Sequence, residues 1–347
     1  MTQEEPHNGA PFMKSNSLDL SLALSDNHYT RPLLQGRVSP QGVRFLPTSV
    51  HPSEMFWRQL KYADFDVSEM SLSSLFIATS KGDTRWVALP IYTSRTFFQT
   101  WILKRTDRGI DSPSDLKGKK VGVPEYQQTA ALWSRGILQD EFGVAARDIE
   151  WFMERGPQMS HGGSTGFVPP QGVVLHQIGP HTNIGEMLIK GELDATLLYL
   201  PHKNLVDRST LDVLSYPFIK PLFENPFQET KRYFEKTGLF PINHTVVIKR
   251  ELYEKEPWLA LNIFHAFQAA KEEADRDAVE AIQSMLETGK LLTDPLNDSS
   301  WMNQAKSYGM KNSRPVIEKI AGYIHQQGLT QRVVSIEEVF AKSTLDI

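Results

Sequence analysis

The first third of the chain alternates between short apolar strands and amphipathic helices. Residues 18 to 25 read Leu-Asp-Leu-Ser-Leu-Ala-Leu-Ser, and this strict alternation predicts the first strand. Val43 to Leu46 predicts a second strand, and the apolar positions of His51 to Lys61 recur at helical spacing. Strands that alternate with helices in this way predict an α/β protein.

A strand that leads directly into a helix occupies residues 65 to 80, and the rest of the chain can be arranged around it. Phe65 and Val67 alternate with polar residues, as in a strand, and Leu72 and Leu75 begin a helical repeat. We therefore expect a strand, a polar turn and a helix in immediate succession.

The polar turn of this unit holds Glu69 and serines at positions 68, 71, 73 and 74. A serine-rich helix start leaves backbone N–H groups and hydroxyls free to face an anion. The alternative needs no ligand, because Ser71 then only caps the helix and Glu69 is a solvated carboxylate. Taken alone, the stretch favours this alternative.

A second strand-and-helix unit follows a change in composition near residue 110. Lys120 to Val123 predicts a strand, and a helix is expected to open after Pro124 and to run to about Phe142. The chain is expected to cross out of the first unit near Phe98 to Lys104, in an extended conformation, and to return near His244 to Lys249. This arrangement predicts a disordered leader (1–16), a discontinuous first lobe (17–104 plus 243–347) and a second lobe (105–242).

A Gly- and Pro-rich run from Gly156 to Gly172 interrupts the second lobe, and a loop of this length is usually functional or disordered. From Pro257 onward the apolar spacing is helical, which predicts a helical C-terminal tail. The other expected elements are a helix at 183–190, strands at 148–153, 195–200 and 240–249, and helices at 258–274, 278–287, 301–308, 315–327 and 336–341.

Length and composition narrow the class of protein. With 347 residues, of which 40% are apolar and 22% charged, the chain suits two globular lobes. A net charge of −4 and the lack of a basic cluster argue against nucleic acid as a partner. No apolar run approaches a membrane span, and the polar first sixteen residues lack the pattern of an export signal, so we expect a cytoplasmic protein. A homo-oligomer is compatible with the sequence.

Four segments of the chain resemble the 4,5-dihydroxyphthalate decarboxylases, and the resemblance spans about residues 18 to 345. The order of the elements is similar to that of a type 2 periplasmic-binding-protein fold, which implies a ligand cleft between two α/β lobes. The resemblance also implies nonoxidative loss of carbon dioxide from a hydroxylated, phthalate-like aromatic acid. The four segments are Phe-Asp-Val-Ser-Glu-Met-Ser-Leu-Ser-Ser (65 to 74), Val-Gly-Val-Pro-Glu-Tyr-Gln-Gln-Thr-Ala (121 to 130), Trp-Ser-Arg-Gly-Ile-Leu-Gln-Asp-Glu-Phe-Gly-Val (133 to 144) and His-Thr-Val-Val-Ile (244 to 248).

The chain departs from this family after Ser94 and Arg95. The family tends to continue with Phe-Arg-His, whereas this chain continues with Thr96-Phe97-Phe98-Gln99. The difference could mean another substrate, or a reaction that does not need the Arg and His.

The implied reaction needs a proton donor to the ring carbon that carries the leaving carboxylate. Histidine or a carboxylic acid suits this task, because its pKa can be brought near neutral pH. We predict His244 as the donor, since it begins the strand that returns through the presumed hinge; the alternative is a buried structural histidine. Glu69 or His28 is expected to orient His244 or to handle the phenol proton, although His28 is about as well explained as a surface residue.

The carboxylate that stays on the ring needs a fixed cation, and arginine suits it through paired hydrogen bonds. Arg31 is a candidate because Pro32 holds the preceding backbone extended at the end of the first strand. Arg95 ends another predicted strand. The start of the helix after residue 124 also favours anions, although Glu125 there could be only a helix-terminal acid. The predicted substrate-binding residues are Arg31, Arg95, Ser71, Ser94, Glu125, Tyr126 and Gln127.

No cofactor is expected, and a divalent metal ion is kept as a minority alternative. The chain has no cysteine, which excludes disulfides, thiolate nucleophiles and thiolate-bound zinc. His161, His176 and His181 are weak metal candidates because three histidines fall within twenty-one residues. No His-x3-His or His-Glu-x2-His motif is present, so solvated loop histidines are the favoured explanation.

Enzymes and binding proteins share the implied fold, so the fold alone does not decide the function. A decarboxylase is favoured because the sequence shows neither an export signal nor a lipid-anchored cysteine, which transport-associated binding proteins usually carry. The alternative is a noncatalytic cytoplasmic binding protein for small aromatic acids.

Overall fold

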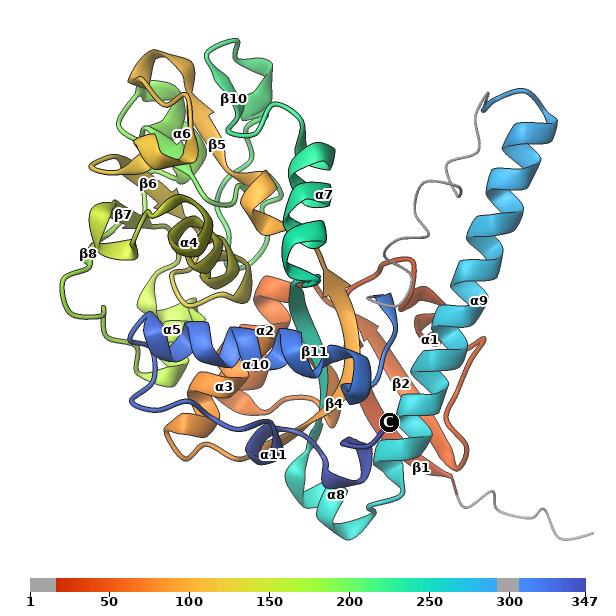
Figure 1. Ribbon diagram of the computed structural model, residues 1–347. Coiled ribbons are helices and arrows are strands. Elements are labelled where there is room, and N and C mark those ends of the chain that lie inside the picture. Colours follow the sequence, from red (N-terminus) through yellow and green to blue (C-terminus); the bar gives the residue numbers. More distant parts are fainter. Residues whose placement is uncertain (1–16, 292–305) are drawn as a thin grey trace, which may run out of the picture.

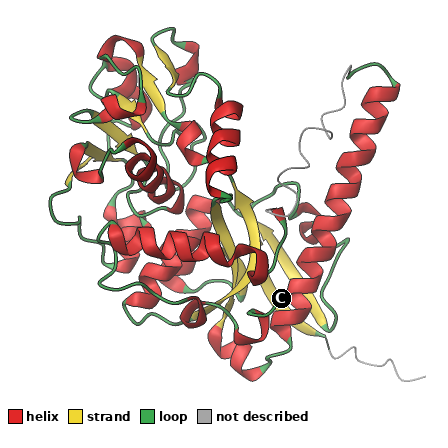
Figure 2. Ribbon diagram, in the orientation of Figure 1, coloured by secondary structure: helices red, strands yellow, loops and turns green. Residues whose placement is uncertain are grey.

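The computed structural model describes residues 17–291 and 306–347, which form two β-sheets surrounded by helices (Figures 1 and 2). The leader expected at 1–16 and most of the helix expected at 301–308 lie outside the described residues. Among the residues described, no helix combines the length and the apolar character that a membrane crossing requires.

The first sheet has five strands in the order β2-β1-β3-β11-β4. The first three strands in sequence run parallel to one another, whereas β11 lies antiparallel between β3 and β4. A strand from the last third of the chain therefore lies between two strands from the first third. The strands are β1 (Leu18–Leu24), β2 (Val43–Ser49), β3 (Val67–Ser71), β4 (Trp86–Arg95) and β11 (Ile242–Lys249).

The second sheet has six strands in the order β10-β5-β9-β6-β7-β8. Four of them, β9, β6, β7 and β8, are parallel, and β5 and β10 close one edge in antiparallel pairs. The strands are β5 (Leu103–Arg105), β6 (Lys120–Val123), β7 (Glu150–Met153), β8 (Val174–Gln177), β9 (Ala195–Thr196) and β10 (Ile219–Pro221).

The two-lobed α/β architecture predicted from the sequence is confirmed, with one sheet in each lobe. The expected lobe boundary after residue 104 falls inside β5, and the one after residue 242 falls at the first residue of β11. The division into lobes at these residues stays a prediction.

The helices pack on both lobes and between them. Helix α2 begins with Pro52 after His51, whose Nδ1 accepts the N–H of Ser53, and α4 ends at Gly143, whose φ of 67° suits glycine. The helices are α1 (Arg31–Leu34), α2 (Pro52–Tyr62), α3 (Leu72–Ser80), α4 (Thr129–Phe142), α5 (His161–Thr165), α6 (Ile184–Lys190), α7 (Pro226–Thr237), α8 (Arg250–Lys255), α9 (Leu259–Glu287), α10 (Met310–Gln326) and α11 (Ile336–Val339).

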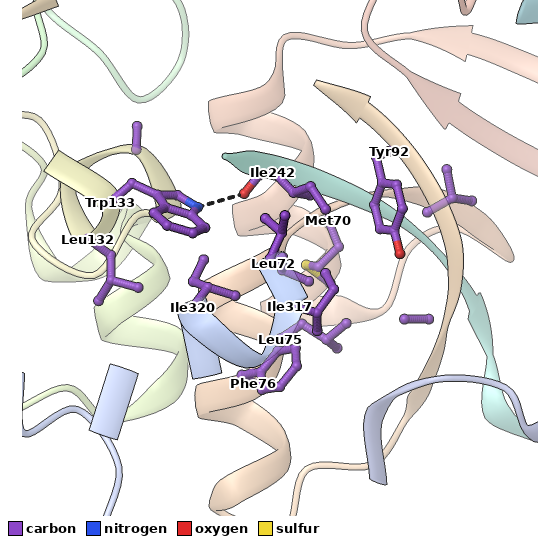
Figure 3. Close-up of a cluster of buried hydrophobic side chains, with 14 of the residues drawn as sticks. Met70, Leu72, Leu75, Phe76, Tyr92, Leu132, Trp133, Ile242, Ile317 and Ile320 are labelled. Atoms are coloured by element: carbon purple, nitrogen blue, oxygen red, sulfur yellow. Dashed lines mark hydrogen bonds between the residues drawn. The ribbon is translucent and has the colours of Figure 1, made fainter. Parts of the chain in front are cut away.

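Helix α10 packs against both α3 and α4, so the C-terminal part of the chain contacts both lobes (Figure 1). Figure 3 shows the buried cluster at this junction, where Ile317 and Ile320 of α10 lie among apolar side chains of β3, α3 and α4. In the same cluster, Trp133 Nε1 donates a hydrogen bond of 2.9 Å to the carbonyl oxygen of Ile242. This bond fixes α4 of the second lobe against β11 of the first.

Four local expectations were wrong. No polar turn separates β3 from α3, because Glu69 and Ser71 belong to β3 and α3 begins at Leu72. Residues 98–104 are not extended throughout, because a 3-10 turn at Phe98–Trp101 precedes β5, and Phe97 there stacks on Phe240 at 4.9 Å. The run from 156 to 172 contains α5, which Ser160 caps by accepting the N–H of Gly163. The helices expected at 258–274 and 278–287 are one continuous helix, α9. At residues 98–104 and 156–172, tertiary packing or capping decided a conformation that local composition left ambiguous.

Candidate functional site

Glu69 and His244 form a buried pair where β3 and β11 meet. The two oxygens of Glu69 accept hydrogen bonds from the N–H and hydroxyl of Ser25 (2.7 and 2.6 Å) and from the hydroxyl of Thr93 (2.7 Å). His244 Nδ1 lies 3.0 Å from Glu69 Oε2. Burial acts to raise the pKa of Glu69, but hydrogen bonds from these donors outweigh it and lower that pKa. Glu69 is therefore a carboxylate, and His244 donates from Nδ1.

The strand register aims His244 at the space between the lobes. His244 lies opposite Ser71 of β3 and Ser94 of β4, so three predicted site residues are direct neighbours across the sheet. The register against β4 shifts on both sides of His244, which indicates a bulge, and bulges commonly redirect a side chain beside a site. Asn243 Nδ2 lies 2.9 Å from His244 Nε2. His244 is 9% exposed and so retains limited access to the cavity.

A cavity of about 500 Å³ opens in front of His244 and is lined by both lobes. This volume is within the range of small-molecule sites, and both polar and apolar side chains line it. The first lobe contributes His51, Ser53, Phe56, Ser71, Ser94, Arg95, Asn243 and His244 among others, and the second contributes Gln128, Thr129, Arg155, His161, Leu198 and Leu200. The ligand cleft expected between the lobes is thus present.

His161 belongs to this cavity and not to a solvated loop. It is 2% exposed, and its Nδ1 lies 3.0 Å from the hydroxyl of Ser74. Burial, assisted by the charge of Arg155, holds the pKa of His161 well below its usual value, so the ring is neutral at neutral pH. The ring of Phe56 lies edge-on to both His161 (5.8 Å) and His244 (4.7 Å), so one aromatic side chain contacts both imidazoles.

A buried ion pair of the second lobe lies at the edge of the cavity, and its arginine also contacts the first lobe. Arg155 Nε donates to Asp207 at 2.7 Å, and Arg155 Nη2 donates to the hydroxyl of Ser53 at the start of α2 at 2.6 Å. Burial acts to raise the pKa of Asp207, but the charge and hydrogen bonds of Arg155 lower it to about 2. The positive charge of Arg155 is therefore already paired within the protein.

Glu125, Tyr126 and Gln127, which the sequence predicts as substrate ligands, lie behind the cavity wall and are not among its lining residues. Glu125 accepts the N–H groups of His161 (3.1 Å) and Gly162 (3.3 Å), so it holds the segment that carries His161. Tyr126 lies with its ring 3.8 Å from the guanidinium of Arg135. In this structure, Glu125 contacts the site through His161.

The carboxyl group of Glu125 should make stability depend on pH. Burial raises its pKa to about 7 from 4.5, so its stabilising contribution is present below about pH 4.5 and is lost as the pH rises through about 7. Between about pH 6 and pH 8, we expect the free energy of unfolding of the wild type to fall by roughly 1 kcal/mol relative to Glu125→Gln. Urea denaturation at both pH values tests this, and parallel curves for the two proteins would contradict it.

Three other residues that the sequence predicts at the site either lie outside the cavity or bind other parts of the protein. Arg31 is exposed and pairs with Asp26 at 3.0 Å, and His28 is exposed; neither lines the cavity. Arg95 does line the cavity, but its Nη2 donates to the carbonyl oxygen of Ser307 (2.9 Å) and to the hydroxyl of Ser313 (3.1 Å). Burial lowers the pKa of Arg95 to about 10. Substrate contacts by these residues stay predictions.

The three metal candidates do not come together. His161 is buried at the cavity, His176 is exposed and lies 2.9 Å from Glu150, and His181 is exposed. Within residues 17–291 and 306–347, no group of three or more His, Asp or Glu side chains is arranged to hold a metal ion.

Sequence reasoning missed Arg155, Gln128, Phe56 and Asn243. Arg155 follows β7, and the same rule that drew attention to the end of the first strand would have indicated it. Gln128 directly follows the predicted Gln127 and is the N-cap residue before α4. No local signal marks Phe56, which the sequence assigns only to the buried face of a helix.

Comparison with known proteins gives one match over most of the chain and another over about half of it. The chain is 32% identical over 340 residues to a 4,5-dihydroxyphthalate decarboxylase of Comamonas testosteroni, covering 95% of this chain and 98% of the relative. It is 39% identical over 184 residues to a 4,5-dihydroxyphthalate decarboxylase of Pseudomonas putida, covering 52% of this chain and 70% of the relative. No protein-family model matches.

Solved structures show the same fold at low sequence identity. The alkanesulfonate-binding protein SsuA from Xanthomonas axonopodis pv. citri matches with a TM-score of 0.55 and 12% identity, covering 93% of this chain and 97% of that chain. The periplasmic aliphatic sulphonate-binding protein SsuA from Escherichia coli matches with a TM-score of 0.52 and 13% identity, covering 93% of this chain and 91% of that chain. The periplasmic-binding-protein-like fold expected from the sequence is confirmed.

Proposed function

Because the chain belongs to the 4,5-dihydroxyphthalate decarboxylase family, we infer that it is an aromatic-acid decarboxylase that removes carbon dioxide from a hydroxylated, phthalate-like acid. The observation that carries the mechanism is the Glu69–His244 pair, which faces a cavity lined by both lobes. A buried carboxylate that orients a histidine toward a ligand site is a recurring arrangement for proton transfer.

In the proposed reaction, His244 Nε2 delivers a proton to the ring carbon that carries the leaving carboxylate. Electrons from the phenol oxygen para to that carbon enter the ring and form the new C–H bond with the proton. The bond to the carboxylate then breaks, its electron pair returns to the ring, and carbon dioxide leaves. In 4,5-dihydroxyphthalate each carboxylate has a hydroxyl in the para position, so either can leave by this route.

Glu69 supports this step without touching the substrate. As a carboxylate that only accepts hydrogen bonds, it fixes the proton of His244 on Nδ1 and leaves Nε2, beside the cavity-lining Asn243, as the nitrogen available to the ligand. The form of His244 that donates from Nε2 carries a proton on both ring nitrogens, and Glu69 accepts the hydrogen bond from the one on Nδ1. Glu69 is therefore proposed as a positioning residue.

Replacing Glu69 with glutamine should lower turnover by roughly tenfold to a hundredfold, the effect expected for losing one charged hydrogen bond. Binding of unsubstituted phthalate, which lacks the electron-donating hydroxyl, should be nearly unchanged because Glu69 does not line the cavity. Steady-state kinetics and calorimetric titration test both statements. Equal losses in turnover and in phthalate affinity would instead give Glu69 a structural role.

The function is tested by carbon dioxide release from a panel of hydroxylated phthalates and benzoates, each with and without chelator. We propose that no cofactor is required, so release from the phthalates should survive the chelator. Loss of activity on chelation would favour a divalent metal ion. Tight binding of the acids with no release from any of them would favour the alternative, a noncatalytic binding protein.

The cytoplasmic location, the homo-oligomer and the lobe limits expected from the sequence stay predictions. Cell fractionation tests the first and light scattering of the purified chain the second. Limited proteolysis tests the lobe limits near residues 104 and 242.

A further inference from the structure

The N-terminus of α4 faces the cavity without an acidic side chain. Gln128, Thr129 and Ala130 line the cavity, and the first intrahelical hydrogen bond runs from the N–H of Leu132 to the carbonyl of Gln128. The N–H groups before Leu132 therefore have no acceptor within the helix. The first turn of this 14-residue helix contains no Asp or Glu and no side-chain cap. Backbone donors and the positive end of the helix dipole thus point toward the cavity.

Gln128 adds a buried side-chain donor at the same place. It is 7% exposed, and its Nε2 has no hydrogen-bond partner within the described part of the chain. Leaving a buried amide N–H without an acceptor is costly, so a ligand oxygen in the cavity would remove that cost.

His161 supplies a second donor. The hydrogen-bond partners around its ring indicate which of the two nitrogens carries the proton. The hydroxyl of Ser74 has two partners, His161 Nδ1 at 3.0 Å and Gln127 Nε2 at 3.5 Å. Gln127 Nε2 is itself a donor, since Gln127 Oε1 accepts from Thr165. His161 Nδ1 is then the acceptor available to the Ser74 proton, so we assign the proton of the neutral ring to Nε2. His161 Nε2 is buried, has no partner among the described residues, and belongs to a ring that lines the cavity.

We propose that Gln128 Nε2, His161 Nε2 and the first N–H groups of α4 bind the carboxylate that stays on the ring. This inference rests on the proposed decarboxylase function and names the substrate feature that the site recognises. Three sets of donors with no acceptor among them suit an anion. All are neutral, so they bind a carboxylate without a cation.

The donors suit the carboxylate that stays and not the one that leaves. The leaving carboxylate becomes neutral carbon dioxide, so hydrogen bonds that stabilise its charge would stabilise the ground state more than the transition state and slow the reaction. The other carboxylate keeps its charge throughout. The leaving group is therefore assigned to the apolar part of the cavity, near Phe56 and His244.

This assignment restricts the substrate to diacids with adjacent carboxylates. A hydroxybenzoate with a single carboxylate would place it on the donors of α4, which leaves no carboxylate in front of His244. The dihydroxybenzoate that remains after one decarboxylation should therefore inhibit competitively and lose no further carbon dioxide.

A charge placed at the site tests the proposal. Gln128→Glu should weaken binding of unsubstituted phthalate by roughly ten- to a hundredfold in calorimetric titration, a measurement that needs no turnover. In steady-state kinetics the same variant should raise KM more than it lowers kcat, because the contact exists before and during the reaction. Gln139→Glu, the same substitution at the exposed far end of α4, is the control and should bind phthalate as the wild type does. Equal effects from the two variants, or unchanged affinity for Gln128→Glu, would overturn the proposal.

His161 offers a second test that does not add a charge. The amide nitrogen of glutamine can reach the position of Nε2, whereas that of asparagine reaches only the position of Nδ1. His161→Gln should therefore retain most of the phthalate affinity, and His161→Asn should lose roughly tenfold or more. If the two variants have equal melting temperatures and equal affinity, Nε2 is not a ligand. Phthalate binding that follows these expectations in a protein that releases no carbon dioxide would support the site and refute the proposed function.

Discussion

Replacing His244 with glutamine is expected to lower turnover of 4,5-dihydroxyphthalate by about a hundredfold to ten-thousandfold, the usual contribution of a general acid. The neutral amide of glutamine cannot deliver a proton to carbon. The affinity for unsubstituted phthalate and the melting temperature should change little, because His244 contributes one edge of the cavity and stays within the same strand pairing.

The matched control for this change is His265→Gln, which makes the same substitution on the exposed side of α9. It should leave turnover unchanged. Normal turnover by His244→Gln would show that the proton comes from elsewhere, and repeating the assay with added zinc and with chelator would then test a metal-bound water. A loss of activity that follows a loss of melting temperature would make His244 structural.

Replacing Asp207 with asparagine is expected to lower the free energy of unfolding by about 3 to 5 kcal/mol, the usual cost of removing one partner of a buried ion pair. Both Arg155 and Asp207 are only 2% exposed, so the remaining guanidinium would stay buried without the carboxylate that pairs with it directly. Arg155 also donates to Ser53 of the first lobe, so the loss should weaken the contact between the lobes. Chemical denaturation at neutral pH measures the change.

An exposed ion pair provides the comparison. Arg332 and Glu338 form a hydrogen-bonded pair at the surface, and Glu338→Gln should cost no more than about 1 kcal/mol. The double substitution Arg155→Met with Asp207→Leu should be more stable than Asp207→Asn alone, because it removes both charges. If Asp207→Asn and Glu338→Gln have similar effects, the guanidinium of Arg155 is solvated and does not link the lobes.

Much of the first sheet could be predicted from sequence because its strands alternate or run into clear helical repeats. The residues at 69, 71, 94 and 244 were selected from strand ends and from segments that resemble a family. That they meet depends on β11 lying between β3 and β4, and a pairing across about 175 residues leaves no local pattern. The resemblance therefore supplied what periodicity could not.

The side of the cavity that the second lobe contributes was predicted less well, for a physical reason. Whether a polar side chain near a helix start faces the ligand or the protein depends on the angle at which the helix packs, here fixed by the bond from Trp133 to β11. Gln127 and Gln128 are adjacent glutamines that no sequence pattern distinguishes. The side chain of Gln127 accepts a hydrogen bond from Thr165, whereas Gln128 lines the cavity. Arg31 was favoured by its place after a strand, but Asp26 five residues earlier pairs with it.

The most direct measurement of this account is a crystal structure of the protein with unsubstituted phthalate, which cannot donate electrons from a para hydroxyl and should remain intact. The account predicts one carboxylate within hydrogen-bond distance of Gln128 Nε2 and His161 Nε2. The ring carbon that carries the other carboxylate should face His244 Nε2, close enough for proton transfer. A phthalate bound with both carboxylates away from α4, or with His244 turned from the ring, would contradict it.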